Sequence, residues 1–331
     1  MEKGLFPSAL RRLRSNALIR SLVNPMRLSH QSLILPLFVE QDLKEPRLVK
    51  YMHGVKVETP SSIFKAIDDA LDSGISKFLI FPVPSLKSSV PSDFSFASNV
   101  VQAIKAAYGQ DIWLASDLCL CSYTTHGHCG ILSPAGDSVL NHDSVQVLAD
   151  YAATLAQAGV DCVAPSDMMD GRVKAIRKQL LAANRTEVVI MSYSSKFSSQ
   201  WYGPFRDACH STPNSAILKD RKSYQLSPLN TSDAINCAIR DAEEGADILM
   251  VKPAGLYTDI ISKIKERISM PLAAYHVSGE YSAIETMAHL GAIDRAQAHL
   301  ETWSSLQRSG ADIIISYAAM EAKKWIENYE Y

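Results

Sequence analysis

Short apolar segments recur along most of the chain, each separated from the next by a longer stretch with helical spacing. The segments have the length of β-strands and are largely apolar on both faces, which is typical of parallel strands buried between layers. Between them, stretches such as 61–73 and 144–158 repeat apolar residues at the spacing of an amphipathic helix. We predict eight strands, at 33–39, 77–83, 112–118, 161–166, 187–193, 247–252, 271–277 and 312–317.

Eight strands alternating with helices predict an α/β fold, a (β/α)8 TIM barrel, here over residues 32–331. A doubly wound open sheet is the alternative, and the absence of a Gly-rich phosphate turn after the first strand disfavours it. Gly74, Gly159, Gly245 and Gly310 each precede a predicted strand, where a helix must end and the backbone must turn back toward the sheet.

The N-terminal segment is basic and has no acidic residue between Glu2 and Glu40. Organelle transit peptides have this composition, so a cleaved leader is one interpretation. In the other interpretation, which we favour, residues 1–31 form an arm with Leu10, Leu13 and Ala17 on one helical face. Such an apolar face would pack on a neighbouring subunit, because it would otherwise stay exposed.

Composition limits the classes of partner. A net charge of -2 gives no general attraction to nucleic acid or to an anionic membrane. No apolar run approaches the roughly 18 residues that a membrane span needs. The cysteines do not suggest a disulfide framework, and the chain starts without a secretory signal pattern, so we expect a reducing cytoplasm or a comparable organelle interior. The ligands should therefore be small molecules.

Polar residues gather where the predicted strands end, which in a barrel is the face that carries the active site. These residues are Asp117, Cys119, Cys121, Ser166, Asp167, Lys196, Lys252, Ser278 and Tyr317. After the fifth strand, the long connection 196–230 interrupts the alternation and predicts either a functional lid or a solvated basic loop. Its side chains suited to bind a carboxylate are Arg206, Lys219, Arg221, Lys222 and Gln225.

Three cysteines lie close together after the third predicted strand. Cys119 and Cys121 alternate with leucines, so an extended backbone points both sulfurs the same way, and Cys129 returns after a loop. Three thiolates suit Zn²⁺ and leave a fourth position open, as a catalytic site requires. The alternative is three buried thiols without a metal. His126 and His128 could add ligands or only pack.

Two lysines lie at the ends of adjacent predicted strands. Lys252 closes the apolar run 247–252, and Lys196 follows the run before it. Burial and a neighbouring cation both lower the pKa of a lysine, and a neutral amine attacks a ketone to form a Schiff base. The alternatives are a snorkelling strand-end lysine for Lys252 and a solvated loop lysine for Lys196.

From about residue 8 to the end, the chain resembles the porphobilinogen synthase family, also called 5-aminolevulinate dehydratase. The resemblance is carried by PLFV at 36–39, DLCLCSYTTHGHCG at 117–130, VAPSDMMDGRV at 163–173, MSYSSKF at 191–197, YGPFRD at 202–207, DRKSYQ at 220–225, MVKP at 250–253, YHVSGEY at 275–281 and GADIIISY at 310–317.

The resemblance implies that two 5-aminolevulinate molecules condense to porphobilinogen, a tetrapyrrole precursor, with loss of two waters. It assigns one Schiff base to Lys252, with Ser278 and Tyr317 binding that carboxylate, and the second to Lys196. The second carboxylate would be bound by Arg206, Arg221 and Gln225, the substrate amine by Asp117 and Ser166, and Zn²⁺ by Cys119, Cys121 and Cys129. The zinc would act as a Lewis acid or assist proton transfer.

The resemblance also implies a homo-oligomer, often an octamer formed through the arm, which interconverts with smaller assemblies such as a hexamer in some members. An allosteric Mg²⁺ is a further feature of some members, and Glu244 is a candidate ligand here. Two rival functions are a Schiff-base aldolase, which needs one barrel lysine and no zinc, and a non-catalytic zinc-binding or assembly partner. The paired lysines argue against the first, and the complete set of site residues argues against the second.

Overall fold

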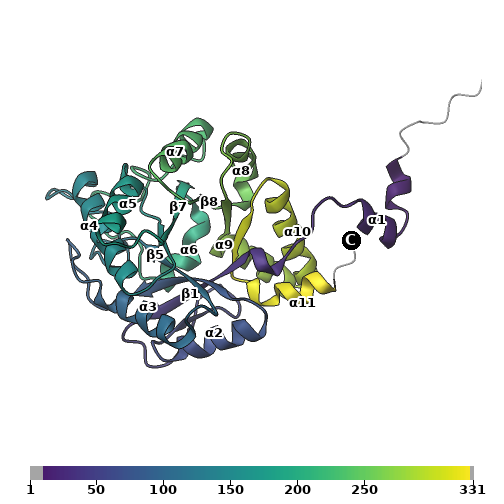
Figure 1. Cartoon of the computed structure of the whole chain (residues 1–331), viewed down its shortest axis with the longest axis horizontal. Coiled ribbons are helices and arrows are strands. Elements are labelled where there is room, and N and C mark those ends of the chain that lie inside the picture. Colours follow the sequence, from purple (N-terminus) through teal and green to yellow (C-terminus); the bar gives the residue numbers. More distant parts are fainter. Residues whose placement is uncertain (1–9, 329–331) are drawn as a thin grey trace, which may run out of the picture.

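Eight parallel strands close into a barrel in the computed structural model, which describes residues 10–328 (Figure 1). The barrel closes because β10 pairs with β1, in the register Leu33↔Ile314. The fold predicted from the sequence is confirmed. The barrel strands are β1 (Leu33–Glu40), β4 (Lys77–Val83), β5 (Trp113–Leu118), β6 (Cys162–Pro165), β7 (Val189–Lys196), β8 (Ile248–Lys252), β9 (Leu272–His276) and β10 (Ile313–Ser316).

The strand boundaries differ most from the prediction at β7. This strand extends to Lys196, beyond the end predicted at residue 193. The prediction stopped too early because the last residues of the strand are polar and carry no apolar pattern. Two short strands were not predicted, β2 (Arg47–Leu48) and β3 (Lys56–Glu58). They pair with each other antiparallel, and β3 adds to β1 in parallel. Strands this short leave no periodicity to detect in the sequence.

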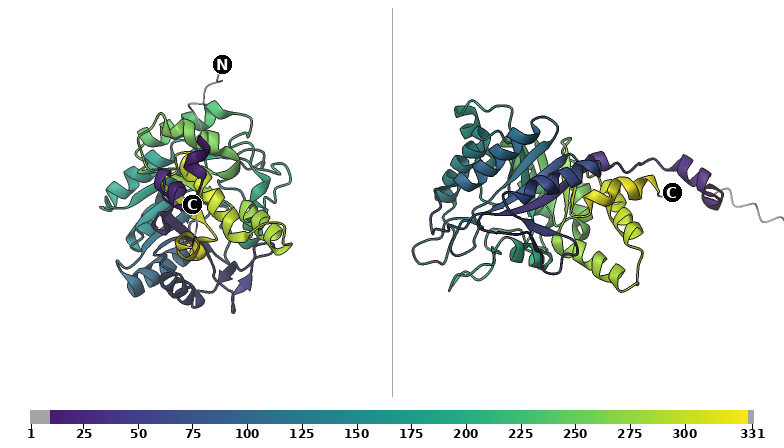
Figure 2. Two further views of the ribbon diagram at one scale, coloured as in Figure 1. Left: turned by 90° about the vertical axis from the view of Figure 1, so that its right-hand side faces the viewer. Right: turned by 90° about the horizontal axis from the view of Figure 1, so that it is seen from below.

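The helices surround the barrel (Figures 1 and 2). In α2, for example, the buried residues Ile63, Ile67 and Ala70 form one apolar face toward the strands. The α-helices of the barrel are α2 (Ser62–Asp72), α3 (Ser95–Tyr108), α4 (Asn141–Gln157), α5 (Arg172–Ala182), α6 (Gly203–Ala208), α7 (Thr231–Glu243), α8 (Thr258–Lys265), α9 (Ser278–His289), α10 (Arg295–Arg308) and α11 (Ala322–Glu327). Short 3-10 helices are η2 (His30–Ser32), η3 (Gln200–Tyr202), η4 (Gly255–Tyr257) and η5 (Ala319–Glu321).

The glycines predicted to end helices adopt the left-handed backbone conformation. Gly74, Gly159, Gly245 and Gly310 have φ values of 85°, 94°, 102° and 114°. Each follows the last turn of a helix and turns the chain toward the next strand. At Gly310 a β-carbon would also lie 2.9 Å from the Lys265 side chain, so a larger residue would be strained and crowded there.

The long connection after β7 is an ordered segment that contains η3 and α6, two short helices that the sequence pattern did not reveal. We call residues 197–230 the lid segment. It is hydrogen-bonded to the loop after β5, where the Asn214 N–H donates to the His126 carbonyl at 2.9 Å. The lid segment is also hydrogen-bonded to the loop after β4, where Lys87 Nζ donates to the His210 carbonyl at 2.8 Å. These contacts keep the lid segment over the carboxyl ends of the strands.

The first part of the described N-terminal segment lies apart from the barrel (Figures 1 and 2), whereas its end contacts the barrel, since Gln307 Nε2 donates to the Arg27 carbonyl at 3.2 Å. It contains η1 (Leu10–Arg14) and α1 (Ala17–Val23), and none of the residues of α1 is buried. The single helical face expected for Leu10, Leu13 and Ala17 is wrong, because the Asn16 side chain caps α1 and separates it from η1. The first nine residues of the predicted arm lie outside the described residues. Between residues 10 and 328, no helix is both long and apolar enough to cross a bilayer.

Candidate active site

Lys196 and Lys252 end two neighbouring strands and project side by side. Their α-carbons are partners in the parallel pairing of β7 with β8. Both residues are buried, with exposed fractions of 5% and 4%. The Lys196 amine donates to the Ser166 carbonyl, at the end of β6. The structure therefore brings the two predicted lysines together at the carboxyl ends of the strands.

The Lys252 amine is surrounded by aromatic rings. Its Nζ lies 4.1 Å from the ring centre of Tyr275, 4.8 Å from that of Phe205 and 5.0 Å from that of Tyr193. Burial is the main cause that lowers the pKa of Lys252 to about 7, and the positive charge of Lys196 adds to it. Much of the Lys252 amine is therefore neutral, and nucleophilic, near pH 7.

Asp117 lies at the end of β5, within the electrostatic influence of both amines. Its Oδ1 is buried and has no hydrogen-bond partner among the described residues. Burial raises the pKa of Asp117, while Lys196, Lys252 and the Ser166 side chain oppose the rise. An unpaired carboxylate oxygen near two amines can accept a hydrogen bond from an amino group of a ligand.

The cysteine trio, Cys119, Cys121 and Cys129, forms a compact cluster after β5. The three Sγ atoms lie within 4.8 Å of one another, and all three residues are buried. Hydrogen bonds from Cys119 and Cys121 hold the pKa of Cys129 well below its usual value, and Arg221 and Lys196 act in the same direction against burial. Three converging sulfurs with a stabilised thiolate fit a soft or borderline cation, so the trio can hold a metal ion.

The nearby histidines pack and are not part of the cluster. His128 Nδ1 lies 3.0 Å from the Tyr224 hydroxyl and Nε2 lies 2.8 Å from the Leu218 carbonyl, so both ring nitrogens are engaged. His126 Nδ1 accepts from the His128 N–H at 3.2 Å. Neither histidine brings a ring nitrogen into the group of converging ligand atoms that the three sulfurs form.

The lid segment contributes three polar side chains to the candidate site. Arg221 and Gln225 are buried, and Arg206 is half-buried. Arg221 Nη2 donates to the carbonyls of Gly127 at 2.9 Å and Ser211 at 2.6 Å. Among the described residues, Arg206 Nε and Arg221 Nε have no partner, and neither does either amide atom of Gln225. Burial and the charge of Arg221 lower the pKa of Arg206. Paired guanidinium groups beside a free amide can bind a carboxylate.

The other basic residues of the lid segment do not join this group. Lys219 and Lys222 are exposed. Lys222 forms a surface ion pair with Asp220 at 3.2 Å. The lid segment therefore divides its predicted carboxylate ligands into an inner group, Arg206, Arg221 and Gln225, and two lysines at the surface.

Ser278 and Tyr317 lie at the ends of the last two barrel strands. Ser278 begins α9, and its Oγ accepts from the Phe205 N–H at 3.2 Å and lies 3.3 Å from the Trp201 carbonyl. The Tyr317 hydroxyl lies 3.2 Å from that of Tyr275, whose ring faces Lys252. Both residues are thus connected to the surroundings of Lys252.

Glu244 lies at the C-terminal end of α7 and is not one of the converging metal-ligand side chains. Its Oε2 accepts from the Lys174 N–H at 3.1 Å, and its Oε1 lies 3.9 Å from Arg240 Nε. Within residues 10–328, the cysteine trio is the group of three or more such side chains whose ligand atoms converge. A magnesium ion at Glu244 stays a prediction.

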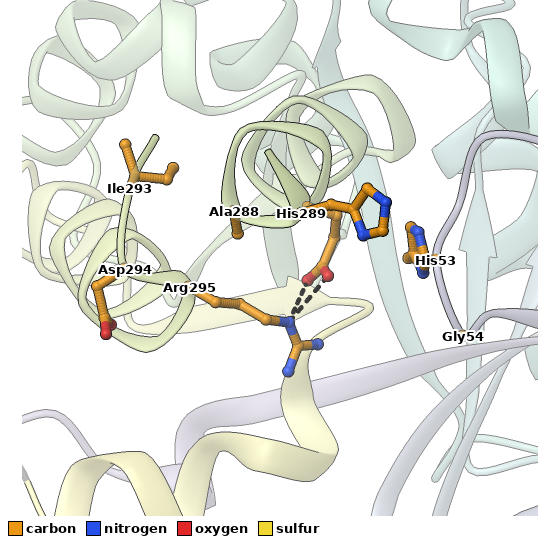
Figure 3. A pocket seen from close by; sticks show the side chains of 8 residues that line it. His53, Gly54, Ala288, His289, Ile293, Asp294 and Arg295 are labelled. Atoms are coloured by element: carbon orange, nitrogen blue, oxygen red, sulfur yellow. Dashed lines mark hydrogen bonds and ion pairs between the residues drawn. The ribbon is translucent and has the colours of Figure 1, made fainter. Parts of the chain in front are cut away.

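A separate surface pocket lies between the loop at His53 and the helices α9 and α10 (Figure 3). The rings of His53 and His289 are 5.2 Å apart at one wall. Arg295 Nε donates to both carboxylate oxygens of Glu285, at 2.9 and 2.8 Å, so these two charges already satisfy each other. None of the predicted site residues lines this pocket.

The chain matches the family model described as delta-aminolevulinic acid dehydratase over residues 8–325. The chain belongs to the delta-aminolevulinic acid dehydratase family. The family member from Halalkalibacterium halodurans is 40% identical, over 96% of this chain and 96% of the relative. The Escherichia coli K12 member is also 40% identical, over 94% of this chain and 95% of the relative.

A solved structure in the same family supports the fold over nearly the whole chain. The delta-aminolevulinic acid dehydratase of Toxoplasma gondii ME49, in complex with the reaction product porphobilinogen, superposes with a TM-score of 0.91 at 39% identity. The match covers 95% of this chain and 90% of that one. The resemblance stated from sequence motifs is therefore confirmed.

The aromatic residues around Lys252 are the part of this dehydratase-family site that sequence reasoning missed. Tyr193, Phe205 and Tyr275 come from β7, α6 and β9, so no local pattern unites them. The available signal was the position of Tyr193 and Tyr275 near predicted strand ends. Tyr224 was also missed, although its hydroxyl contacts His128 beside the cysteine trio.

Proposed function

We propose that the chain condenses two molecules of 5-aminolevulinate into the pyrrole porphobilinogen, with loss of two waters. One observation carries the proposal: two buried lysines are register partners on neighbouring strands, beside three converging cysteines. Each substrate has a ketone, and two amines can hold two ketones as Schiff bases at once. The Toxoplasma gondii family member, whose structure contains this product, supports the same assignment.

Lys252 forms the first Schiff base in this proposal. Its lowered pKa supplies a neutral amine near pH 7, and the surrounding rings exclude the water that would hydrolyse an imine. Ser278 and Tyr317 bind the carboxylate of this substrate. Ser278 follows β9, the neighbour of the strand that ends in Lys252, and Tyr317 follows β10, the next strand along, so both can fix the ketone relative to the amine.

Lys196 forms the second Schiff base. Asp117 and Ser166 bind the amino group of this substrate, since the buried Asp117 Oδ1 has an unused acceptor position in the described structure. Arg206, Arg221 and Gln225 bind its carboxylate. The lid segment must open to admit substrate and then close, because Arg221 and Gln225 are buried in the structure.

The cysteine trio holds Zn²⁺ in this proposal, because three sulfurs that converge beside a positively charged guanidinium fit a thiophilic ion that keeps one open position. When bound, the ion supplies Lewis-acid chemistry next to the second substrate. The residues Cys119, Cys121 and Cys129 would hold it. A Mg²⁺ site that includes Glu244 remains a separate and secondary proposal.

We further propose that residues 1–31 form an oligomerisation arm and that residues 32–331 form the catalytic domain. In α1, Leu18 and Leu22 are 84% and 76% exposed, which leaves an apolar surface for another copy of the chain. An octamer that interconverts with a hexamer is the assembly that the family resemblance implies. We place the enzyme in the cytoplasm.

The test combines a pyrrole assay with borohydride trapping. Colorimetric detection after 5-aminolevulinate is added should reveal a pyrrole. Borohydride reduces a substrate Schiff base to a stable adduct on the lysine, and peptide mapping should find this adduct, the label, first on Lys252. The Lys252→Ala variant should lose that label. Lys263→Ala is the control, since Lys263 is half-exposed and pairs with Asp259 on the helix that follows β8. A wild-type protein that makes no pyrrole, or that carries the label only elsewhere, would refute the proposal.

A further inference from the structure

The side chains of β7 do not alternate regularly between the two faces of the sheet. Ser192 Oγ donates to Asp241 Oδ2 at 2.6 Å, and Ser195 Oγ donates to the Ala234 carbonyl at 2.7 Å. Both acceptors belong to α7, outside the barrel. Residues three positions apart in a regular strand face opposite sides. The strand must therefore contain an irregularity between Ser192 and Ser195.

The pairing with β8 shows what the irregularity is. Ser192 pairs with Leu249 and Ser195 pairs with Val251, so β7 uses one more residue than β8 over this stretch. That is a β-bulge, which re-aims the side chains that follow it. The bulge also explains why Tyr193 and Lys196, three positions apart, both face the interior of the barrel. The Tyr193 ring lies 5.0 Å from Lys252 Nζ and 5.5 Å from Lys196 Nζ. Without the extra residue, Lys196 would point toward α7.

A buried arginine holds this bulge. Arg172 is fully buried, and its Nη2 donates to Ser192 Oγ at 3.0 Å and to the Tyr193 carbonyl at 3.2 Å. The Tyr193 carbonyl lies inside the bulge, where the regular ladder is interrupted, so the guanidinium supplies a donor there. Asp241 Oδ2 accepts from the same Nη2 at 3.1 Å and from Ser192 Oγ. Asp241 is fully buried too.

The same arginine also holds the segment that the Lys196 amine contacts. Arg172 Nη1 donates to the Met169 carbonyl at 3.1 Å, and Arg172 Nε lies 3.5 Å from Asp167 Oδ2. Asp167 directly follows Ser166, whose carbonyl accepts from the Lys196 amine. Arg172 thus contacts both the backbone before Lys196 and the segment that receives its side chain.

We propose that Arg172, held by Asp241, is a positioning residue for Lys196: it fixes the bulge that turns this lysine into the barrel and the segment that receives its amine. The inference rests on the proposed function, in which Lys196 forms a Schiff base. A buried ion pair is a weak source of stability, since desolvation offsets most of its attraction. The defined geometry of the ion pair between Arg172 and Asp241 suits a role in orienting Lys196 instead. Misplacement of a reacting group by about 1 Å can reduce a rate on the order of 100-fold.

The experiment compares the two lysines within one protein. Arg172→Met, Arg172→Lys and Ser192→Ala are incubated with 5-aminolevulinate and borohydride, and peptide mapping gives the ratio of label at Lys196 to label at Lys252. The ratio should fall by about tenfold to 100-fold in Arg172→Met and by less in Ser192→Ala. Arg172→Lys should recover part of it, because one charged donor returns.

Arg177→Met is the matched control. Arg177 lies on the same helix, α5, and its Nη1 donates to the Val188 carbonyl at 3.2 Å, just before β7 and away from the bulge. This variant should keep the wild-type ratio even where its melting temperature falls. A purely structural role for Arg172 would reduce the label at both lysines together.

Two results would overturn the inference. One is a wild-type labelling ratio in folded Arg172→Met. If that variant does not fold, an unchanged ratio in Ser192→Ala has the same force, because the loss of its hydroxyl removes two of the contacts around Arg172 and Asp241. The failure of the proposed function looks different, since the wild-type protein would then form no pyrrole and carry label at neither lysine.

Discussion

The α-carbons of Lys196 and Lys252 are partners in the parallel pairing of β7 with β8, and both amines lie near the ring of Tyr193. Two ammonium groups on these paired strand ends repel each other, and the repulsion is strong because both side chains are buried. The cost of charging both lysines favours a neutral Lys252. The pairing of two strands therefore prepares a nucleophile.

The first prediction concerns pH. Because only the neutral amine attacks a ketone, the rate of borohydride-trapped label at Lys252 should rise as pH increases through about 7, the pKa of this lysine. Lys196→Met removes a positive charge that lowers this pKa, so the rise should move to higher pH. An increase of about one in the pKa lowers the neutral fraction at pH 7 roughly fivefold.

Asp117→Asn provides the opposite test, since the Asp117 charge raises the pKa of Lys252. The rise in labelling should then move to lower pH. Lys263→Met should leave the profile unchanged. A wild-type profile that rises only near the pKa of an ordinary lysine would contradict the role given to burial and to Lys196.

The second prediction concerns the cysteine trio. A chelator should lower the activity and Zn²⁺ should restore it, and Cys129→Ser should lose both bound metal and activity. The loss should be about 100-fold or more, because Lewis-acid stabilisation is worth several kcal/mol. Cys237→Ser is the control, since Cys237 lies on α7, outside the trio. Full activity after metal removal, verified by metal analysis, would discard the zinc proposal.

The third prediction separates binding from stability at Gln225. Both amide atoms of this buried side chain lack a partner among the described residues, so Gln225→Leu should stabilise the substrate-free protein by about 1 kcal/mol. The same change should raise KM about tenfold or more, because a hydrogen bond to the substrate carboxylate is lost. Calorimetry and steady-state kinetics measure the two effects.

Gln146→Leu serves as the control for Gln225, because Gln146 is exposed on α4. It should change neither the melting temperature nor KM appreciably. A Gln225→Leu protein that is less stable, with an unchanged KM, would place this amide in a structural role.

The fourth prediction concerns the N-terminal arm. Replacing Leu18 and Leu22 with glutamate should reduce the size of the assembly in analytical ultracentrifugation, because both side chains are highly exposed in the single chain. The melting temperature of the barrel should change little, since no residue of α1 is buried against it. Leu290→Glu, at an exposed leucine after α9, should leave the assembly unchanged. An unaltered sedimentation coefficient in the α1 variant would argue against the arm.

Local patterns in the sequence were sufficient to predict the barrel and much of its candidate site. Runs apolar on both faces marked the eight strands, and strand ends in a parallel barrel meet at one face whatever the details of packing. For that reason Asp117, Lys196 and Lys252 could be assigned to one region. The spacing of Cys119, Cys121 and Cys129 likewise predicted that their sulfurs converge.

Other features depend on contacts between residues that are distant in the sequence. The rings around Lys252 come from three separate elements, and Arg172 meets Asp241 and the bulge of β7 only when α5 and α7 pack on that strand. The register shift between Ser192 and Ser195, after which Lys196 faces inward, likewise appears only in the paired strands. The sequence by itself determined which residues stand at the ends of the strands, because apolar periodicity is local. The tertiary structure decided which way they face and how their charges interact, because both depend on neighbours supplied by the rest of the chain.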